Sequence, residues 1–273
     1  MIINRSFKEF KLQHRSKKNQ IIYSSKKVQS DKEVLNLIDN FLIEKNSFIF
    51  ESVEKGKIKG RYTIFGKNPD KIWEFNNNNS FLIKNNKKVK LKEKPQILIE
   101  NIIEDFKFKI PSGLPSIASL ISGYFSYDTI RYIENIPNKC KDDLKVPDVR
   151  LLRPRILVIH DNLKKKIFYI VNIFKDEKIS NYPKKYLGIK SDLSKLFTQS
   201  LKTKDKTTNE KKLAKINVKS NTSKNKFLSM VNKAKKYIKI GDIFQVVLSQ
   251  RFETKLTKKP LDIYKKLRIT NPS

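Results

Sequence analysis

The chain of 273 residues has few of the side chains that build metal centres, disulfides or redox sites. It contains one cysteine, Cys140, and two histidines, His14 and His160. A single cysteine excludes an intramolecular disulfide and is typical of a protein from a reducing compartment. The two histidines are far apart in the sequence, and neither has the spacing of metal ligands around it. The sequence therefore predicts neither a disulfide scaffold nor a zinc site.

Long apolar runs are also missing. No window is apolar over the roughly 20 residues that a membrane-spanning helix needs, and the first residues lack the apolar core of a signal peptide. The apolar fraction, 38%, is low but sufficient for a globular core at this length. We therefore expect a cytoplasmic protein that does not enter a membrane.

Acidic residues are scarce relative to basic ones. The chain has 60 Lys and Arg against 27 Asp and Glu, which gives a formal net charge of +33. Such a charge is typical of proteins that bind nucleic acid or an anionic surface. However, the basic residues are spread over the whole length, and Lys, which cannot bind phosphates and bases in the bidentate manner of Arg, predominates. An AT-rich coding composition explains this pattern better, and we expect only non-specific binding to polyanions at low salt.

Catalytic motifs that can be recognised by themselves are absent. The sequence shows no Ser/His/Asp set and no phosphate-binding loop of the G-x-x-x-x-G-K type. Any functional assignment therefore depends on the order of helices and strands and on the residues placed within them.

The first two thirds of the chain predict helices around antiparallel strands. Residues 1–30 are polar and are expected to form a loosely held lead-in. Helical spacing predicts helices over 31–42, with Asp31 as N-cap, and over 95–106 and 187–201. Alternating or apolar runs predict strands over 47–53, 61–66, 72–75 and 81–83, with a turn over 76–79. A hairpin is expected from arms 153–160 and 166–174 with its turn at 161–163.

The last third begins with a predicted domain boundary. Residues 202–225 are rich in Lys, Thr, Asn and Ser, which is typical of a linker. A helical stripe from Phe227 to Ile238 follows and is expected to end at Gly241. A strand over 243–254 and a helix that begins at Pro260 complete the chain. Helices interleaved with antiparallel strands predict an α+β fold.

Gln245 is the one polar side chain within the apolar run that opens this strand. A buried amide without a partner costs about 1–3 kcal/mol, so Gln245 needs either a partner in the core or a ligand in a pocket. The pattern alone leaves both interpretations open.

Four strings resemble anthranilate synthase component I, a chorismate-utilising enzyme. The first, Phe50-Glu51-Ser52, is similar to a Leu-Glu-Ser segment of the family, and the second, Gly60 to Gly66, is similar to its GRYSFIG. The third, Gly123 to Asp128 followed by Arg131-Tyr132, is similar to its GYxGYDxVR. The fourth runs from Phe227 to Arg251. The strings occur in the family's order and with its separations, from about residue 31 to residue 273.

The resemblance implies an α+β fold with antiparallel sheets, and a lyase reaction in tryptophan biosynthesis. In that reaction ammonia, supplied from glutamine by an amidotransferase subunit, attacks chorismate, the hydroxyl leaves with help from Mg²⁺, and pyruvate is eliminated to leave anthranilate. The resemblance places Glu51 and Ser52 in a feedback site for L-tryptophan. Relatives that use water carry a lysine base at the position of Gln245. A neutral amide can orient a nucleophile but cannot act as general base, in agreement with the ammonia-using branch.

Alternatives remain open on the residues alone. Aminodeoxychorismate synthase component I shares the chemistry but usually reads GDIYQVNL, whereas this chain has Val247 in place of the Asn. Glu51 and Ser52 also fit a polar pair on an edge strand. A non-catalytic basic binding module is the alternative from another class.

Two departures from the family pattern affect these expectations. Ser126 replaces a usual glycine, so the backbone there is expected to avoid positive φ. The family is also roughly twice as long as this chain, and the expected Mg²⁺ ligands lie beyond Ser273. We therefore expect a regulatory domain over 31–201, a linker over 202–225, and a truncated chorismate-binding domain over 226–273 that is inactive alone.

Overall fold

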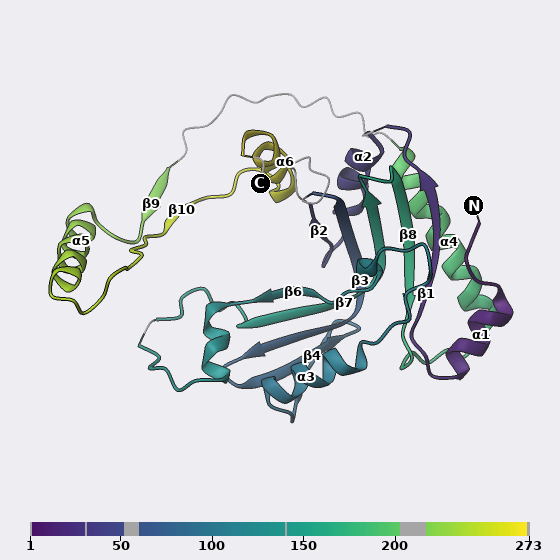
Figure 1. Cartoon of the computed structure of the whole chain (residues 1–273), viewed down its shortest axis with the longest axis horizontal. Helices are drawn as coiled ribbons and strands as arrows, with labels where there is room; N and C mark the ends of the chain where they lie inside the picture. The colour runs from purple at the N-terminus through teal and green to yellow at the C-terminus, as the bar shows by residue number, and fades with distance from the viewer. Residues whose placement is uncertain (1, 31, 52–59, 140, 203–216, 272–273) are drawn as a thin grey trace. The chain divides into compact units, whose positions relative to one another are not determined.

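The structure is a computed structural model that describes residues 2–30, 32–51, 60–139, 141–202 and 217–271. The chain divides into two compact units, unit 1 up to residue 205 and unit 2 over residues 206–271. Each unit is described by itself. Within these ranges the antiparallel sheets and surrounding helices confirm the predicted α+β class (Figure 1).

Unit 1 is built on a long antiparallel pair, β3 (Tyr62–Asn76) and β7 (Val149–Asp161). Tyr62 lies opposite Asp161 at one end, and Phe75 lies opposite Val149 at the other. The register shifts between Pro69 and Lys71, because proline lacks the N–H that a regular ladder requires and is tolerated at a bulge. The prediction of two separate strands at 61–66 and 72–75 is therefore wrong: they are the two halves of one strand.

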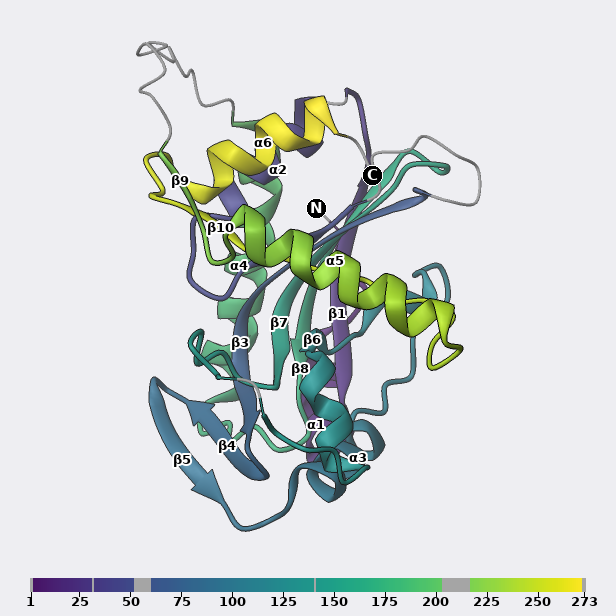
Figure 2. The same ribbon diagram turned by 90° about the vertical axis from the view of Figure 1, so that its left-hand side faces the viewer.

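The first half of this pair lies in the part of the eight-stranded sheet that is covered on both faces. β1 (Gln20–Lys27) and β8 (Lys166–Ile173) continue it beyond β7, and β2 (Phe48–Phe50) pairs with the other side of β3. The helices α1 (Phe7–Arg15), α2 (Lys32–Phe41) and α4 (Tyr182–Leu201) lie together on one side (Figures 1 and 2). Leu37, Phe41 and Leu193 are completely buried there. The β7–β8 hairpin agrees with the predicted one.

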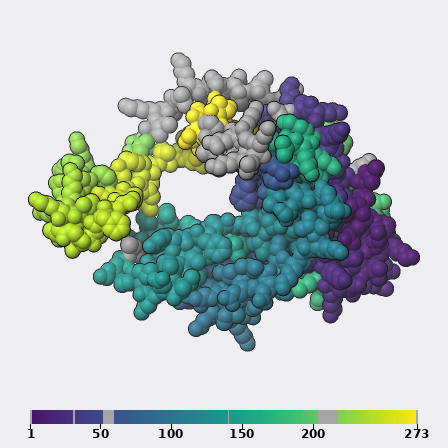
Figure 3. Space-filling model, in the orientation of Figure 1, coloured from purple at the N-terminus to yellow at the C-terminus, as the bar shows by residue number. Residues whose placement is uncertain are grey.

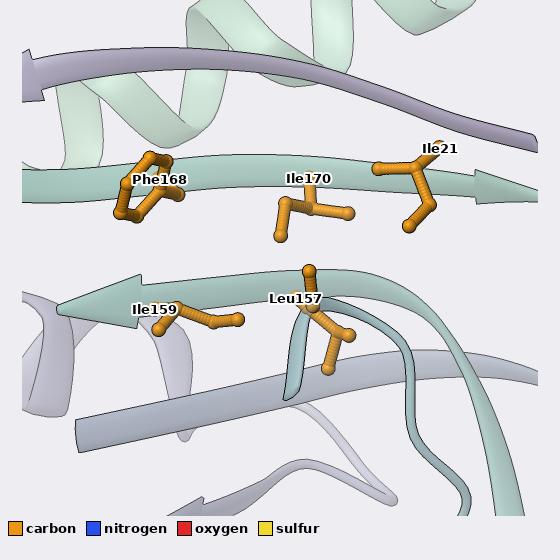
Figure 4. Close-up of a cluster of buried hydrophobic side chains, with 6 residues drawn as sticks. Ile21, Leu157, Ile159, Phe168 and Ile170 are labelled. Atoms are coloured by element: carbon orange, nitrogen blue, oxygen red, sulfur yellow. The ribbon is translucent and has the colours of Figure 1, made fainter. Parts of the chain in front are cut away.

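The opposite face carries an apolar cluster, most of which Figure 4 shows. It consists of Ile21, Ala118, Leu157, Ile159, Phe168 and Ile170. The segment between α3 (Pro95–Asp105) and β6 (Ser122–Phe125), which includes the short 3-10 helix η1 (Ser116–Ala118), packs Phe108, Ile110 and Leu114 against this cluster. Burial on both faces explains why β8 reads as a continuous apolar run rather than an alternating one.

The expectation of a loosely held segment 1–30 is wrong. Ser6 and Glu9 form a capping box that starts α1, and Phe10 of that helix is completely buried between Tyr182 and Tyr186. The whole of β1 pairs with β8, whose residues lie 139 to 153 positions further along the chain. The space-filling view shows the purple atoms of this segment in close contact with the rest of the unit (Figure 3). A partner strand so distant in sequence leaves no local signal.

The second half of the long pair lies in the part of the same sheet that one helix covers. β6 pairs with β7, while β4 (Asn79–Lys84) and β5 (Lys87–Leu91) extend the sheet beyond β3. α3 packs on the face that carries Trp73, Phe75 and Leu151. Paired asparagines with positive φ form the turns on both sides of β4, at 77–78 and 85–86. This confirms the predicted turn over 76–79, whereas β5 was not predicted because its sequence, KKVKL, is largely basic.

An ion-pair network holds the bend between the two halves. Arg153 donates to Asp70 over 2.8 Å and to Asp176 over 3.0 Å, and its guanidinium lies 3.9 Å from the centre of the Phe174 ring. Lys71 completes the network with a contact of 2.5 Å to Asp176. Burial alone would raise the pKa of Asp176, but Lys71 and Arg153 outweigh it and lower the pKa to about 2.

The predicted helices are present with shifted ends. The predicted helices over 31–42 and 95–106 correspond to α2 and α3, while the predicted N-cap Asp31 lies outside the described residues. α4 begins at Tyr182, five residues before the predicted start, because Asn181 caps it and Pro183 occupies its first turn. None of the described helices is both long and apolar enough to cross a membrane.

Unit 2 contains two helices and one short ladder in its described part. α5 (Lys224–Lys239) is capped by Ser223, and the chain leaves it through Gly241 at φ +83°, as predicted. β9 (Val218–Ser220) pairs with β10 (Phe252–Thr254), and α6 (Pro260–Thr270) begins at the predicted proline. No residue of these four elements is buried.

Gly66 and Gly188 form a matched pair for testing the packing of unit 1. A Cβ atom on Gly66 would lie 2.1 Å from the Phe48 ring, whereas one on Gly188 in α4 would meet nothing within 4 Å. Gly66→Ala is expected to lower the free energy of unfolding by about 1–3 kcal/mol. Gly188→Ala is expected to raise it by up to about 1 kcal/mol, because alanine favours the helix. Urea unfolding measures both, and equal effects would contradict the described packing.

Asp176 should make unit 1 sensitive to acid. Its pKa is lowered from the ordinary 3.8 to about 2, so its ion pairs stabilise the fold above about pH 4 and are lost as the pH falls towards 2. Asp176→Asn is expected to cost about 1 kcal/mol at pH 7, since screening weakens a partly exposed pair, and to flatten stability between pH 4 and 2. Glu100→Gln, an exposed position of α3, is the control. An unchanged acid profile in Asp176→Asn would refute the network's role.

Candidate functional site

The first candidate residues lie at the end of β2. Glu51 follows this strand directly and is half-buried, and Ser52 lies outside the described residues. β2 consists of three residues that pair with Ile64, Phe65 and Gly66 of β3. Of the two predicted feedback residues, the structure therefore describes only Glu51, which lies beside the first half of β3.

The string from Gly60 to Gly66 fixes the start of β3. The Arg61 guanidinium donates two hydrogen bonds, of 3.2 and 2.9 Å, to Asp161, the last residue of the neighbouring strand β7. Burial opposes ionisation of Asp161, but Arg61 and the backbone N–H groups of Leu163 and Lys164 outweigh it and lower the pKa of Asp161. Asn162 donates from its side chain to the Gly60 carbonyl over 3.0 Å. These residues join the two strands and the following turn.

Gly66 ends the same string for a packing reason. It lies opposite Phe48 of β2, whose ring occupies the space that a side chain at position 66 would need. The aromatic ring covers the glycine backbone, which allows β2 to lie close to β3. The string therefore supports the position of β2.

The third string, Gly123 to Asp128, forms β6 and the entry to the 3-10 helix η2 (Tyr127–Tyr132). A side chain at Gly123 would collide with the backbone carbonyl of Arg150 at 1.9 Å, so the close pairing of β6 with β7 requires glycine here. Ser126 has φ −75°, which confirms that the backbone avoids positive φ. Asp128 accepts a hydrogen bond of 2.7 Å from Arg131.

Asp148 connects this string to the second sheet. Its carboxylate accepts hydrogen bonds from the Tyr132 hydroxyl over 2.7 Å and from the Asn77 backbone N–H over 3.0 Å. Its backbone carbonyl accepts from the Ser126 N–H over 2.7 Å. Burial of the ring and the bond to Asp148 raise the pKa of Tyr132 far above its ordinary value. Tyr132 is therefore a fixed neutral donor and no acid–base group.

The structure corrects the environment predicted for Gln245. A strand was expected over 243–254, but only Phe252–Thr254 forms one, and Gln245 lies exposed in an irregular stretch. Phe244 and Val247 beside it are 97% and 81% exposed. A strand needs a neighbour for its backbone groups, and the described part of unit 2 offers β9 alone, which reaches only residues 252–254. Within unit 2 as described, Gln245 therefore faces no pocket.

Comparison with known proteins decides the family. A model of the chorismate binding enzyme family matches residues 45–273. The chain belongs to this family.

Relatives in the chorismate binding enzyme family carry a consistent name. Anthranilate synthase component 1 of Acetivibrio thermocellus is 35% identical over 93% of this chain and 52% of its own length. The protein of the same name from Cereibacter sphaeroides is 28% identical over 98% of this chain and 55% of its own. The chain therefore spans about half the length of the curated relatives it matches.

A solved structure of the family agrees with the fold. The crystal structure of anthranilate synthase component I from Streptococcus pneumoniae TIGR4 has a TM-score of 0.65 and 26% sequence identity. The match covers 91% of this chain and 53% of that one. The resemblance found in the four strings is thereby confirmed.

The described residues do not form a site for the Mg²⁺ ion that the family resemblance implies. In the described ranges no three His, Cys, Asp or Glu side chains come together as ligands for a metal. His160 is buried in β7, and His14 is bonded to the Tyr182 hydroxyl at 2.9 Å. Cys140 lies outside the described residues. The described residues therefore assign no chemical step to a metal ion.

The sequence does not reveal the ion pairs on either side of β2. Its pattern places Asp161 and Asn162 in a hairpin turn and gives no signal at Glu44 or Lys67. The structure brings Arg61 to Asp161 and Lys67 to Glu44. An Arg or Lys near a predicted strand end gives no indication of which of 27 acidic residues it will contact.

The exposed stretch around Gln245 gives a direct prediction. Backbone amides of residues 243–250 should exchange with deuterium almost as fast as in an unfolded peptide, because they lack ladder partners in the described part of unit 2. Amides of β8 should be strongly protected and serve as the internal control. Hydrogen exchange followed by mass spectrometry measures both, and strong protection of residues 243–250 in the 273-residue chain would contradict the assignment.

Proposed function

We propose that this protein acts as component I of an anthranilate synthase, a lyase that converts chorismate and ammonia to anthranilate and pyruvate. The observation that carries the proposal is the 35% identity to a protein of that name over 93% of the chain. The fold match supports it. The activity is proposed for the complete protein, since the chain spans about half of its relatives.

Ammonia is the nucleophile in this proposal, and a glutamine amidotransferase subunit is its source. Gln245 supports ammonia over water because its neutral side chain donates and accepts hydrogen bonds without removing a proton at neutral pH. Its exposure in unit 2 is consistent with a site that further sheet neighbours complete. A requirement for Mg²⁺ belongs to the proposal through the family resemblance alone.

L-Tryptophan is the proposed feedback inhibitor. Glu51 offers a carboxylate to the ligand's ammonium group, and Ser52 offers a hydroxyl. A half-buried carboxylate at a strand end suits this role, since partial exclusion of water strengthens its attraction for a cation.

Product identity tests the proposed reaction. The complete reading frame, supplied with chorismate, ammonium and Mg²⁺, is expected to release anthranilate, identified by its mass and fluorescence. Aminodeoxychorismate as the product would move the assignment to that neighbouring enzyme. Absence of any turnover, together with nucleic-acid binding that keeps its sequence preference at high salt, would favour a basic binding module instead. The 273-residue chain alone is expected to give no anthranilate.

Gln245→Lys tests the role of the amide. A charged ammonium group in place of the amide is expected to reduce anthranilate formation by about a hundredfold, the scale of a single group that acts directly in catalysis. Gln250→Lys adds the same charge five residues later on the same exposed stretch and is the matched control. Equal activity in the two variants would remove Gln245 from the site.

A further inference from the structure

β2 is a short strand at the edge of the sheet. It has three residues and one neighbouring strand, and Phe50 at its end is 47% exposed. Short edge strands with few buried contacts open easily. Glu51 follows directly, so a shift of β2 also moves Glu51.

The first fixed point precedes the strand. The Lys67 ammonium of β3 is almost completely buried, lies 4.6 Å from the centre of the Phe41 ring, and contacts the Glu44 carboxylate at 2.5 Å. Glu44 in turn accepts a bond of 2.7 Å on its backbone carbonyl from the Ser47 hydroxyl, one residue before β2. We call the pair Glu44–Lys67 the front latch. A buried ammonium needs its partner, so Glu44 is held firmly.

The second fixed point is where the chain returns to the sheet. Gly60 has φ +76° and its carbonyl accepts the side-chain N–H of Asn162. The Arg61 carbonyl accepts the Asn162 backbone N–H over 2.8 Å, and the Arg61 guanidinium is bound by Asp161. We call Arg61, Asp161 and Asn162 the rear latch. It ties the start of β3 to the end of β7 through charge-assisted hydrogen bonds.

We propose that the two latches position Glu51 and thereby set the sensitivity of the protein to its amino-acid inhibitor. The inference rests on the proposed feedback function. The two latches join the chain on either side of β2 to the buried strands β3 and β7. The latch residues are positioning residues: their loss leaves the carboxylate of Glu51 in the chain but lets its strand shift.

The test compares Glu44→Gln and Asp161→Asn with Glu177→Gln in the complete protein. Asp161→Asn keeps an oxygen for the turn amides while it weakens the tie to Arg61. Glu177 binds Arg155 and Lys185 away from the latches and is the matched control. Each latch variant is expected to raise the tryptophan concentration for half-inhibition about tenfold, the usual size of a coupling, with kcat and KM for chorismate within about twofold. The exchanged pair Glu44→Lys with Lys67→Glu is expected to recover part of the sensitivity.

A second readout keeps the inference separate from the proposed function. Deuterium uptake of residues 46–51 should rise in both latch variants and stay unchanged in Glu177→Gln. If the wild-type enzyme does not respond to tryptophan, the feedback assignment fails, and unchanged uptake in the variants would overturn the latches as well. If the wild type responds and the latch variants respond equally, the inference is wrong. If all three variants lose both kcat and sensitivity to tryptophan, the latches contribute only to general stability, and the inference is also wrong.

Discussion

The pairing of β3 with β7 is the constraint on which the rest of unit 1 depends. Both strands run through the two parts of the eight-stranded sheet, so the bend at Pro69 between these parts has to be held. Arg153 does this by holding Asp70 and Asp176 together over the Phe174 ring. A guanidinium is suited to this position because its planar fork bonds two carboxylates and still stacks on an aromatic face.

The same pair carries the candidate ligand segment. β2 adds to the first half of β3, while β6, with the Asp128–Arg131 and Tyr132–Asp148 contacts that follow it, adds to the start of β7 at residues 149–152. Three of the strings that resemble the family therefore lie on one strand pair. Most of their residues act through packing: Gly66 and Gly123 allow close approach, and Arg61 ties strand ends. Family resemblance in such strings reports the scaffold, whereas Glu51, directly after β2, is the residue proposed to bind the ligand.

Local patterns in the sequence predicted most helices and the β7–β8 hairpin, because helical spacing and apolar runs depend on neighbours in the chain. They could not predict that β1 pairs with β8, or that Arg61 contacts Asp161, since both depend on residues 100 or more positions apart. Gln245 shows that a local pattern can also predict burial that the described part of unit 2 does not provide. Its apolar neighbours indicate a buried strand, but burial needs partners, and the described part of unit 2 leaves them exposed.

We propose that the protein senses tryptophan at the end of β2, which the β3–β7 pair holds. The most direct measurement is a titration of the complete, isotopically labelled protein with L-tryptophan, followed through the backbone amide signals of residues 48–51 and 61–66. We expect saturable shifts concentrated in these residues, and none with L-lysine as the control. Saturable binding that leaves β2 and the first half of β3 unchanged would contradict the account.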